Sequence, residues 1–121
     1  MLGLGTDVVD VERFRVALNR TPRIVGRLFT DAEQSYARQL RDPTERLAVR
    51  FAAKEATMKA LGVGLGAFAF RDVEVRNAES GEPSLSLTGG ARDLADGRGV
   101  RLWRVSVTHS HAVALAVVIA L

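Results

Sequence analysis

Apolar positions change their spacing several times along this chain, and each change predicts a new element. Residues 1–6 alternate larger side chains with glycine, which indicates a short strand that ends at Asp7. In residues 8–19 the apolar side chains return every three or four positions, which is the spacing of one helix face. Pro22 cannot continue a helix, so the second element is predicted to end there.

Two further helices are indicated by the residues that begin them. Thr30 and Glu33 stand three positions apart, as in a capping box, and predict a helix over residues 31–40. The pair Asp42-Pro43 opens a helix that can continue to Leu61, because a glycine follows it as a stop signal. That helix would be about 28 Å long. Its apolar stripe consists of Leu47, Phe51, Met58 and Leu61.

The second half of the chain contains most of the predicted strands. The last one is apolar on both faces, with alanines on one side, so we expect it at the centre of a sheet or against another subunit. The order of elements indicates an α+β fold, a single domain over residues 1–121 with a mainly antiparallel sheet packed against the long central helix. We expect strands at 72–76, 84–87, 101–107 and 112–120 and a short helix at 91–95.

Composition narrows the class of protein. Of the 121 residues 47% are hydrophobic, which excludes a disordered chain. There is no cysteine, so disulfides and thiolate metal sites are excluded, and an intracellular, cytoplasmic setting is the simplest expectation. The longest apolar run, residues 112–121, is too short to span a bilayer, so we expect no membrane segment.

Positive charge is concentrated near the N-terminus. The net charge is +3, and the segment from Arg13 to Arg27 carries five arginines and no acid. Such a segment attracts an acidic protein or a polyanion, unless it is only a solvated helix face. Aromatic side chains do not alternate with these arginines, as they would in a groove for single-stranded nucleic acid.

Lysine is rare in this chain and occurs in one place. The only two lysines, Lys54 and Lys59, flank Glu55, whereas there are fifteen arginines elsewhere. An ammonium can be tuned by its surroundings in a way that a guanidinium cannot, so this position favours a functional role. The alternative is a surface pair between Glu55 and Lys59, which would stabilise the helix by only about 0.3–0.5 kcal/mol. Lys54 lies near the centre of the apolar stripe and needs a partner or a path to solvent.

Three other groups could carry chemistry. Asp7 at a strand end and Glu55, expected to be half-buried on a helix flank, are hard oxygen ligands that suit Mg²⁺. Glycines at 62, 64 and 66 follow a helix rather than open one, so they favour a helix cap and a turn over a dinucleotide site. His109 and His111 are expected to point in opposite directions and not to share a metal.

The motifs in their order resemble the 4′-phosphopantetheinyl transferase family, and in particular its small trimeric type, the holo-acyl-carrier-protein synthases. The signature is Gly5-Thr6-Asp7 followed by Phe51-Ala52-Ala53-Lys54-Glu55-Ala56-Thr57-Met58-Lys59. Further matches cover nearly the whole chain; they are Phe29 to Glu33, Lys59 to Gly62, Asp72 to Val75, Gly81 to Pro83 and Ser106 to His109.

The resemblance implies an activity and a role for each matching residue. The enzyme would transfer the 4′-phosphopantetheine arm of coenzyme A to a serine of an apo acyl carrier protein and release 3′,5′-ADP. Asp7 and Glu55 would hold Mg²⁺ at the pyrophosphate, while Lys59 would contact the transferred or released phosphate and Glu55 would take the serine proton, directly or through a water. Residue 110, often acidic in relatives, is Ser110, which leaves a third protein ligand open. Arg46 and Arg50 would bind the 3′-phosphate, and Gly62, Gly64, Pro83, Thr108 and His109 would line the nucleotide.

The resemblance also implies partners. Active sites would lie between the subunits of a homotrimer, and the acidic carrier would dock on the segment from Arg13 to Arg27. Neither a fatty-acid nor a polyketide carrier is favoured by the residues. Two other classes fit part of the sequence: another magnesium-dependent, nucleotide-binding transferase or hydrolase, and a basic module that binds nucleic acid. The resemblance favours neither, and implies no nucleic-acid or membrane partner.

Overall fold

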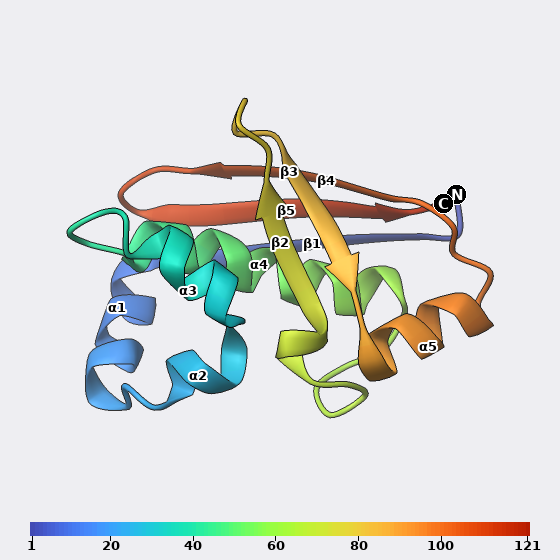
Figure 1. Ribbon diagram of the computed structural model, residues 1–121, viewed down its shortest axis with the longest axis horizontal. Helices are drawn as coiled ribbons and strands as arrows, with labels where there is room; N and C mark the ends of the chain where they lie inside the picture. The colour runs from blue at the N-terminus through green and yellow to red at the C-terminus, as the bar shows by residue number, and fades with distance from the viewer.

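The protein, described here by a computed structural model over residues 1–121, combines two antiparallel sheets with five α-helices (Figure 1). The elements in chain order are β1 (Gly3–Asp10), α1 (Val11–Arg20), α2 (Ile24–Leu28), α3 (Asp31–Ala37), α4 (Thr44–Ala60), the short 3₁₀ helix η1 (Phe70–Asp72), β2 (Val73–Asn77), β3 (Pro83–Leu87), α5 (Gly89–Gly97), β4 (Trp103–His109) and β5 (Val113–Ala120).

The long helix α4 lies against the larger sheet. That sheet has the strand order β1-β5-β4, with both pairs antiparallel, and the hairpin of β2 and β3 forms the second sheet. In Figure 1, α4 runs along the three strands, while α1, α2 and α3 gather at one end of it and α5 at the other. The predicted α+β class, with a mainly antiparallel sheet packed on a long central helix, is therefore confirmed. No helix is long and apolar enough to cross a membrane.

Glycine lets β1 lie directly on α4. A Cβ atom on Gly3 would overlap the carbonyl oxygen of Ala60, and one on Gly5 would overlap that of Ala56. Both helix residues are small, so the two backbones meet with no side chain between them. The helix therefore fills the space beside these two glycines, and the close approach that they allow is to the protein's own backbone.

The last strand, β5, is central as predicted, and its two faces differ. Its alanines at 114, 116 and 120 are fully buried on the α4 side. The other face of the sheet carries Leu115, Val117 and Ile119, which pair with exposed β1 residues such as Leu4 and Val8. The face left open is thus the aliphatic one, and the alanine face packs against the protein's own helix.

Several boundaries differ from the predicted ones. Strand β1 continues to Asp10, and α1 begins only at Val11, because Asp10 accepts a hydrogen bond from the backbone N–H of Arg13 at 2.9 Å and caps the helix. The apolar spacing at Val8 and Val9 belongs to the strand, where Val9 faces the core and Val8 faces outward. Helix α2 was not expected, while α3 ends earlier and α5 is longer than the spacing indicated.

A buried ion pair joins α3, α4 and β2. The Nζ atom of Lys54 donates to Glu33 Oε1 at 2.8 Å, to the carbonyl of Phe70 at 3.0 Å and to the carbonyl of Val73. Glu33 also accepts from the backbone N–H groups of Thr30 and Val75, both at 2.9 Å. Neither charged side chain is exposed. Burial lowers the pKa of Lys54 and the charge of Glu33 opposes this, so the lysine finds the partner that its position requires.

Replacing one member of this pair should destabilise the fold strongly. We expect Lys54→Met to lower the free energy of unfolding by about 3–5 kcal/mol, because Glu33 would keep a buried charge without its partner. Urea unfolding followed by circular dichroism measures the loss. The double variant Lys54→Met with Glu33→Gln should recover part of it, since the charge is then removed. A single variant as stable as the parent chain would contradict this account of the pair.

Candidate active site

Asp7, Glu55 and Lys59 line one open cavity of about 570 Å³. Asp7 comes from β1, and the other two come from successive turns of α4 on the side that faces that strand. The glycine contact between the two elements sets this meeting, because Asp7 lies two residues after Gly5 and on the same face of the strand. The structure therefore brings together three of the residues that the sequence singled out.

Lys59 bonds to the strand rather than to its helix neighbour. Its Nζ atom lies 3.2 Å from Asp7 Oδ1 and 3.0 Å from the carbonyl oxygen of Thr6. No ion pair forms between Lys59 and Glu55, so the alternative of an ordinary helix-surface pair is wrong. The lysine side chain is 54% exposed and the Asp7 side chain 17%, which leaves the ammonium open to a ligand from solvent.

The two carboxylates repel each other. Burial raises the pKa of Glu55, the negative charge of Asp7 raises it further, and the positive charge of Lys59 opposes both effects. Glu55 is half-buried, as expected from its place on the helix flank. Such a pair of oxygen ligands beside an open cavity is stabilised by a bound cation. No group of three or more aspartate, glutamate or histidine side chains in the chain is arranged to hold a metal ion, so Asp7 and Glu55 stand as a pair of candidate ligands.

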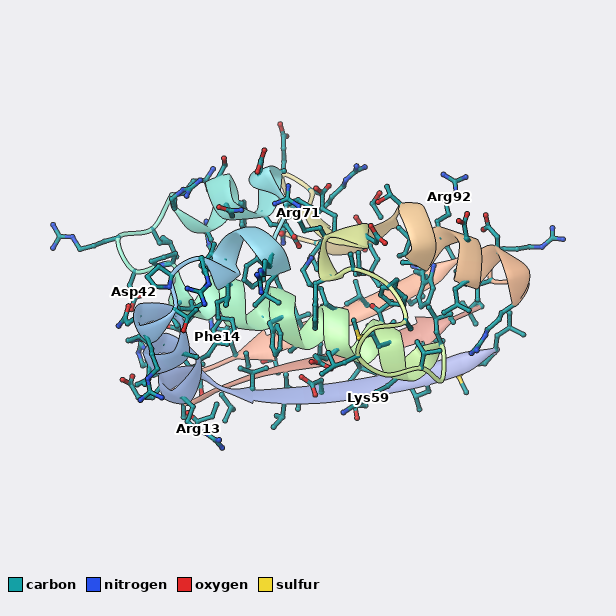
Figure 2. All side chains as sticks on the ribbon, turned by 90° about the horizontal axis from the view of Figure 1, so that it is seen from below. Arg13, Phe14, Asp42, Lys59, Arg71 and Arg92 are labelled. Atoms are coloured by element: carbon teal, nitrogen blue, oxygen red, sulfur yellow. The ribbon has the colours of Figure 1, made fainter.

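Phenylalanines fix the wall beside these residues. Phe51, the aromatic residue of the signature, has its ring centroid 5.3 Å from that of Phe14 in α1 and 5.6 Å from that of Phe70. Both Phe14 and Phe51 line the cavity, together with Arg13. The aromatic contact holds α1 against α4, so the cationic side chain of Arg13 stands at the same cavity as Lys59 (Figure 2).

Arg46 and Arg50 lie elsewhere. Arg50 precedes Glu55 by five positions and Arg46 precedes it by nine, which turns them about 140° and about 180° around the axis of α4 from Glu55. Their guanidinium groups both sit over the ring of Tyr36, with 4.1 Å and 4.4 Å from the ring centroid to the central carbons. One subunit thus carries two separate clusters of candidate residues.

Arg50 is buried without an acidic partner. It is 3% exposed and donates to Asn77 Oδ1 and to the carbonyl of Arg46, while its Nε atom has no acceptor. Burial lowers the pKa of Arg50. Neither Tyr36 nor Asn77 was among the expected site residues. Tyr36 is the only tyrosine in the chain, but its contact with two arginines ten and fourteen positions later depends on how α3 packs against α4.

The expected nucleotide-lining residues are spread over the turn after α4, the start of β3 and the end of β4. Gly62 ends α4 with a positive φ of 70°, and its N–H donates to the carbonyl of Lys59, as expected of a helix cap. Gly64 follows in the next turn, where an added Cβ atom would meet nothing within 4 Å. Pro83 begins β3 opposite Asn77, and Thr108 lies at the exposed end of β4.

The directions of the two histidines were predicted wrongly. His109 Nδ1 lies 3.0 Å from Glu45 Oε1, and His111 Nδ1 lies 3.3 Å from Glu45 Oε2. Both rings therefore turn toward one carboxylate, His109 from the end of β4 and His111 from the turn that follows it. Ser110 between them accepts hydrogen bonds from the N–H groups of Ala112 and Val113 and shapes the turn.

Comparison with known proteins identifies the family. A sequence model described as the 4′-phosphopantetheinyl transferase superfamily matches residues 3–118. The holo-[acyl-carrier-protein] synthase of Moorella thermoacetica is 44% identical over 97% of this chain and 91% of its own length, and that of Frankia alni is 47% identical over 99% and 97%.

Solved structures agree with the sequence match. The holo-[acyl-carrier-protein] synthase of Neisseria meningitidis superposes with a TM-score of 0.90 at 30% identity, covering 99% of this chain and 98% of that one. The synthase of Bacillus anthracis, solved in complex with CoA (3′,5′-ADP), gives a TM-score of 0.83 at 33% identity, covering 98% and 95%. With Asp7, Glu55 and Lys59 of its signature at one cavity and nearly its whole length matched, the chain belongs to the 4′-phosphopantetheinyl transferase superfamily.

Proposed function

We propose that this protein is a holo-acyl-carrier-protein synthase. It transfers the 4′-phosphopantetheine arm of coenzyme A to a serine hydroxyl of an apo carrier protein and releases 3′,5′-ADP. The observation that carries the proposal is the meeting of Asp7, Glu55 and Lys59 at one cavity. Two relatives that carry this name, matched over 91% and 97% of their own length, support it, as does the coenzyme A complex of a structural neighbour. The transferase unit spans residues 1–121, and we expect it to act in the cytoplasm.

Asp7 and Glu55 are the residues that would hold Mg²⁺. The structure fits this ion, because two adjacent carboxylates with unfavourable mutual charge face an open cavity, and magnesium commonly takes one or two carboxylates with water and substrate phosphates. When bound, the ion would neutralise charge on the diphosphate of coenzyme A. Lys59 would then direct its exposed ammonium at the phosphate that is transferred or released.

The chain's own groups account for the proton and charge movements. The serine oxygen attacks the β-phosphorus of coenzyme A, the bond from that phosphorus to the bridging oxygen breaks, and 3′,5′-ADP departs with the negative charge. Glu55 is placed to receive the serine proton, since it lies at the same cavity as the phosphate-binding lysine. Lys59 stabilises charge on the phosphate oxygens, which is the main requirement of phosphoryl transfer.

A homotrimer with shared sites would join the two clusters. Arg46, Arg50 and Tyr36 stand on the other side of α4 from Lys59, and the buried guanidinium of Arg50 has no acidic partner of its own. An anion such as the 3′-phosphate would satisfy it. We propose that the arginine cluster of one subunit serves the carboxylates of the next, and that the open aliphatic face of the sheet, with Leu4 and Val117, lies in the interface.

The segment from Arg13 to Arg27 is the proposed docking surface for the acidic carrier. Arg13 is exposed and lines the cavity of Asp7 and Lys59, so a carrier held there can present its serine to the site. Figure 2 places Arg13 and Lys59 along the same edge of the molecule, whereas Arg92 lies on α5 at the other end. Charge complementarity of this kind contributes orientation and association rate more than affinity.

Loss of either carboxylate should abolish transfer. We expect Asp7→Ala and Glu55→Gln each to lower kcat/KM by at least about a hundredfold, because each removes half of the protein's metal ligands. The mass of an apo carrier protein incubated with coenzyme A and Mg²⁺ measures the reaction, and Asp93→Asn on the exposed side of α5 is the control. Full activity of either variant with EDTA present would reject the assignment of the metal ligands.

Mixed subunits should report whether the site is shared. Asp7→Ala and Arg50→Gln chains, each weakly active alone, should together recover up to about a quarter of the parent activity after dissociation and reassembly, because one site in four then has both halves intact. Asp7→Ala mixed with Lys59→Ala should recover nothing, since both residues belong to the same half. Recovery in the second mixture, or a monomer by sedimentation, would refute the shared trimeric site.

Reversing the charge of Arg13 should weaken the interaction with the carrier protein and leave that with coenzyme A unchanged. We expect Arg13→Glu to raise KM for the apo carrier by about tenfold, to weaken the dependence of that KM on salt, and to leave KM for coenzyme A unchanged. Arg92→Glu is the matched control, an exposed helix arginine far from the cavity. Initial rates at several salt concentrations measure these effects. If the variant loses affinity for coenzyme A and keeps its KM for the carrier, this segment belongs to the nucleotide site and the docking proposal is wrong.

A further inference from the structure

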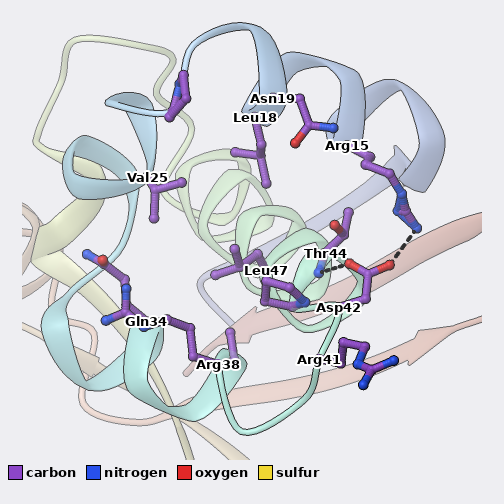
Figure 3. A pocket seen from close by; sticks show the side chains of 13 residues that line it. Arg15, Leu18, Asn19, Val25, Gln34, Arg38, Arg41, Asp42, Thr44 and Leu47 are labelled. Atoms are coloured by element: carbon purple, nitrogen blue, oxygen red, sulfur yellow. Dashed lines mark hydrogen bonds and ion pairs between the residues drawn. The ribbon is translucent and has the colours of Figure 1, made fainter.

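A second cavity, of about 520 Å³, lies on the other side of α1 from Arg13. It is enclosed by α1, α2, α3 and the start of α4, with the loop between α3 and α4 at its mouth (Figure 3). Its volume falls in the range of about 300–1,000 Å³ that small-molecule sites occupy. None of the residues proposed above to hold the metal, the phosphates or the nucleotide lines it.

The inner wall of this cavity is apolar. Leu18 of α1, Val25 of α2 and Leu47 of α4 point toward its open middle in Figure 3. Leu18 and Leu47 are only 9% and 4% exposed and Ala37 of α3 is fully buried, so they form the closed back of the wall. Val25 is half-buried and Pro22 is exposed, and an alkyl group that entered here would cover their surface, which is favourable.

The rim supplies hydrogen-bond donors that the protein does not use. Arg38 and Arg41 are exposed and form no ion pair, and the side-chain amide of Asn19 makes no hydrogen bond. Arg15 binds Asp42 Oδ2 through Nη2 at 3.1 Å, while its buried Nη1 atom has no acceptor. Positive charge and free donors thus stand beside the apolar wall.

The one acid on the rim is already engaged. Asp42 Oδ1 accepts from the backbone N–H of Thr44 at 3.0 Å, and its other oxygen pairs with Arg15 (Figure 3). Hydrogen bonds from Thr44 and, after them, the charge of Arg15 lower the pKa of Asp42. The negative charge of Asp42 is therefore stabilised by Thr44 and Arg15. Arg38 and Arg41 have no acidic partner and can attract a ligand anion.

We propose that this cavity binds a small amphiphile with one anionic head group, a carboxylate or a phosphate. The apolar body lies on Leu18, Val25 and Leu47, and the head group accepts hydrogen bonds from Arg38 and Arg41 at the mouth. The site is separate from the cavity of Asp7, Glu55 and Lys59, because α1 stands between the two cavities and presents Arg13 to one and Arg15 to the other. Five of its lining residues belong to the segment from Arg13 to Arg27; they are Arg15, Leu18, Asn19, Pro22 and Val25. This binding does not rest on the transfer reaction.

Titration with octanoate, octyl phosphate and octanol tests the proposal in the full chain. Isothermal calorimetry measures the affinities, and amide NMR shifts locate the ligand. We expect both anions to bind and to move the signals of Leu18, Val25 and Leu47, and octanol to bind at least about tenfold more weakly, since hydrogen bonds to charged groups are lost. The tighter of the two anions identifies the head group, and either order supports the proposal.

Substitutions on the rim separate this site from ordinary surface binding. The double variant Arg38→Gln with Arg41→Gln changes only exposed side chains and should weaken octanoate by at least about tenfold. Arg92→Gln, which removes an exposed arginine from α5, should leave the affinity unchanged. Equal affinity for octanol and octanoate, shifts confined to other residues, no binding of any probe, or displacement of octanoate by coenzyme A would each overturn the proposal.

Discussion

The contact between β1 and α4 is the constraint on which the candidate site depends. Gly3 and Gly5 allow the strand backbone to touch the helix backbone at Ala60 and Ala56, with no room for a Cβ atom between them. Two elements at this spacing form a rigid pair, because any added side chain would force them apart. Asp7, two residues beyond, is thereby held beside Lys59, with its Oδ1 atom 3.2 Å from the lysine Nζ.

Helix α4 serves a different purpose on each of its sides. Toward β1 it presents Glu55 and Lys59 to solvent at the cavity, while toward α3 and β2 it inserts Lys54 into a set of acceptors that leaves no part of the ammonium free. The adjacent signature residues Lys54 and Glu55 therefore have different roles: Lys54 stabilises the fold, and Glu55 faces the cavity. The buried pair with Glu33 fixes the rotation of the helix about its axis, and that rotation determines that Glu55 faces the cavity.

The sequence predicted what depends on local chemistry and missed what depends on packing. The capping box at Thr30 and the span of α4 follow from residue type and spacing, the grouping of Asp7 with Glu55 was implied by the family resemblance, and the structure contains all three. The start of α1 was misplaced because valines at 8 and 9 suit a helix face and a strand equally, and only pairing with β5 decides between them. The backbone contact of the strand glycines with α4 and the packing of two arginines over the ring of Tyr36 join segments that are distant in the sequence. A single sequence carries no signal for such contacts.

The unequal use of lysine and arginine also has a structural reason. Lys54 is fully buried with three oxygen acceptors around one nitrogen, an arrangement that suits a compact ammonium better than a planar fork, while the exposed Lys59 faces two acceptors. Arg46 and Arg50 occupy the converse surroundings, where flat guanidinium groups cover the aromatic ring of Tyr36. The acceptors of Lys54 and those of Lys59 lie beside neighbouring turns of α4, which is why the two lysines stand on either side of Glu55. Folding alone therefore accounts for the lysine at position 54, and only Lys59 keeps an ammonium that a substrate can reach.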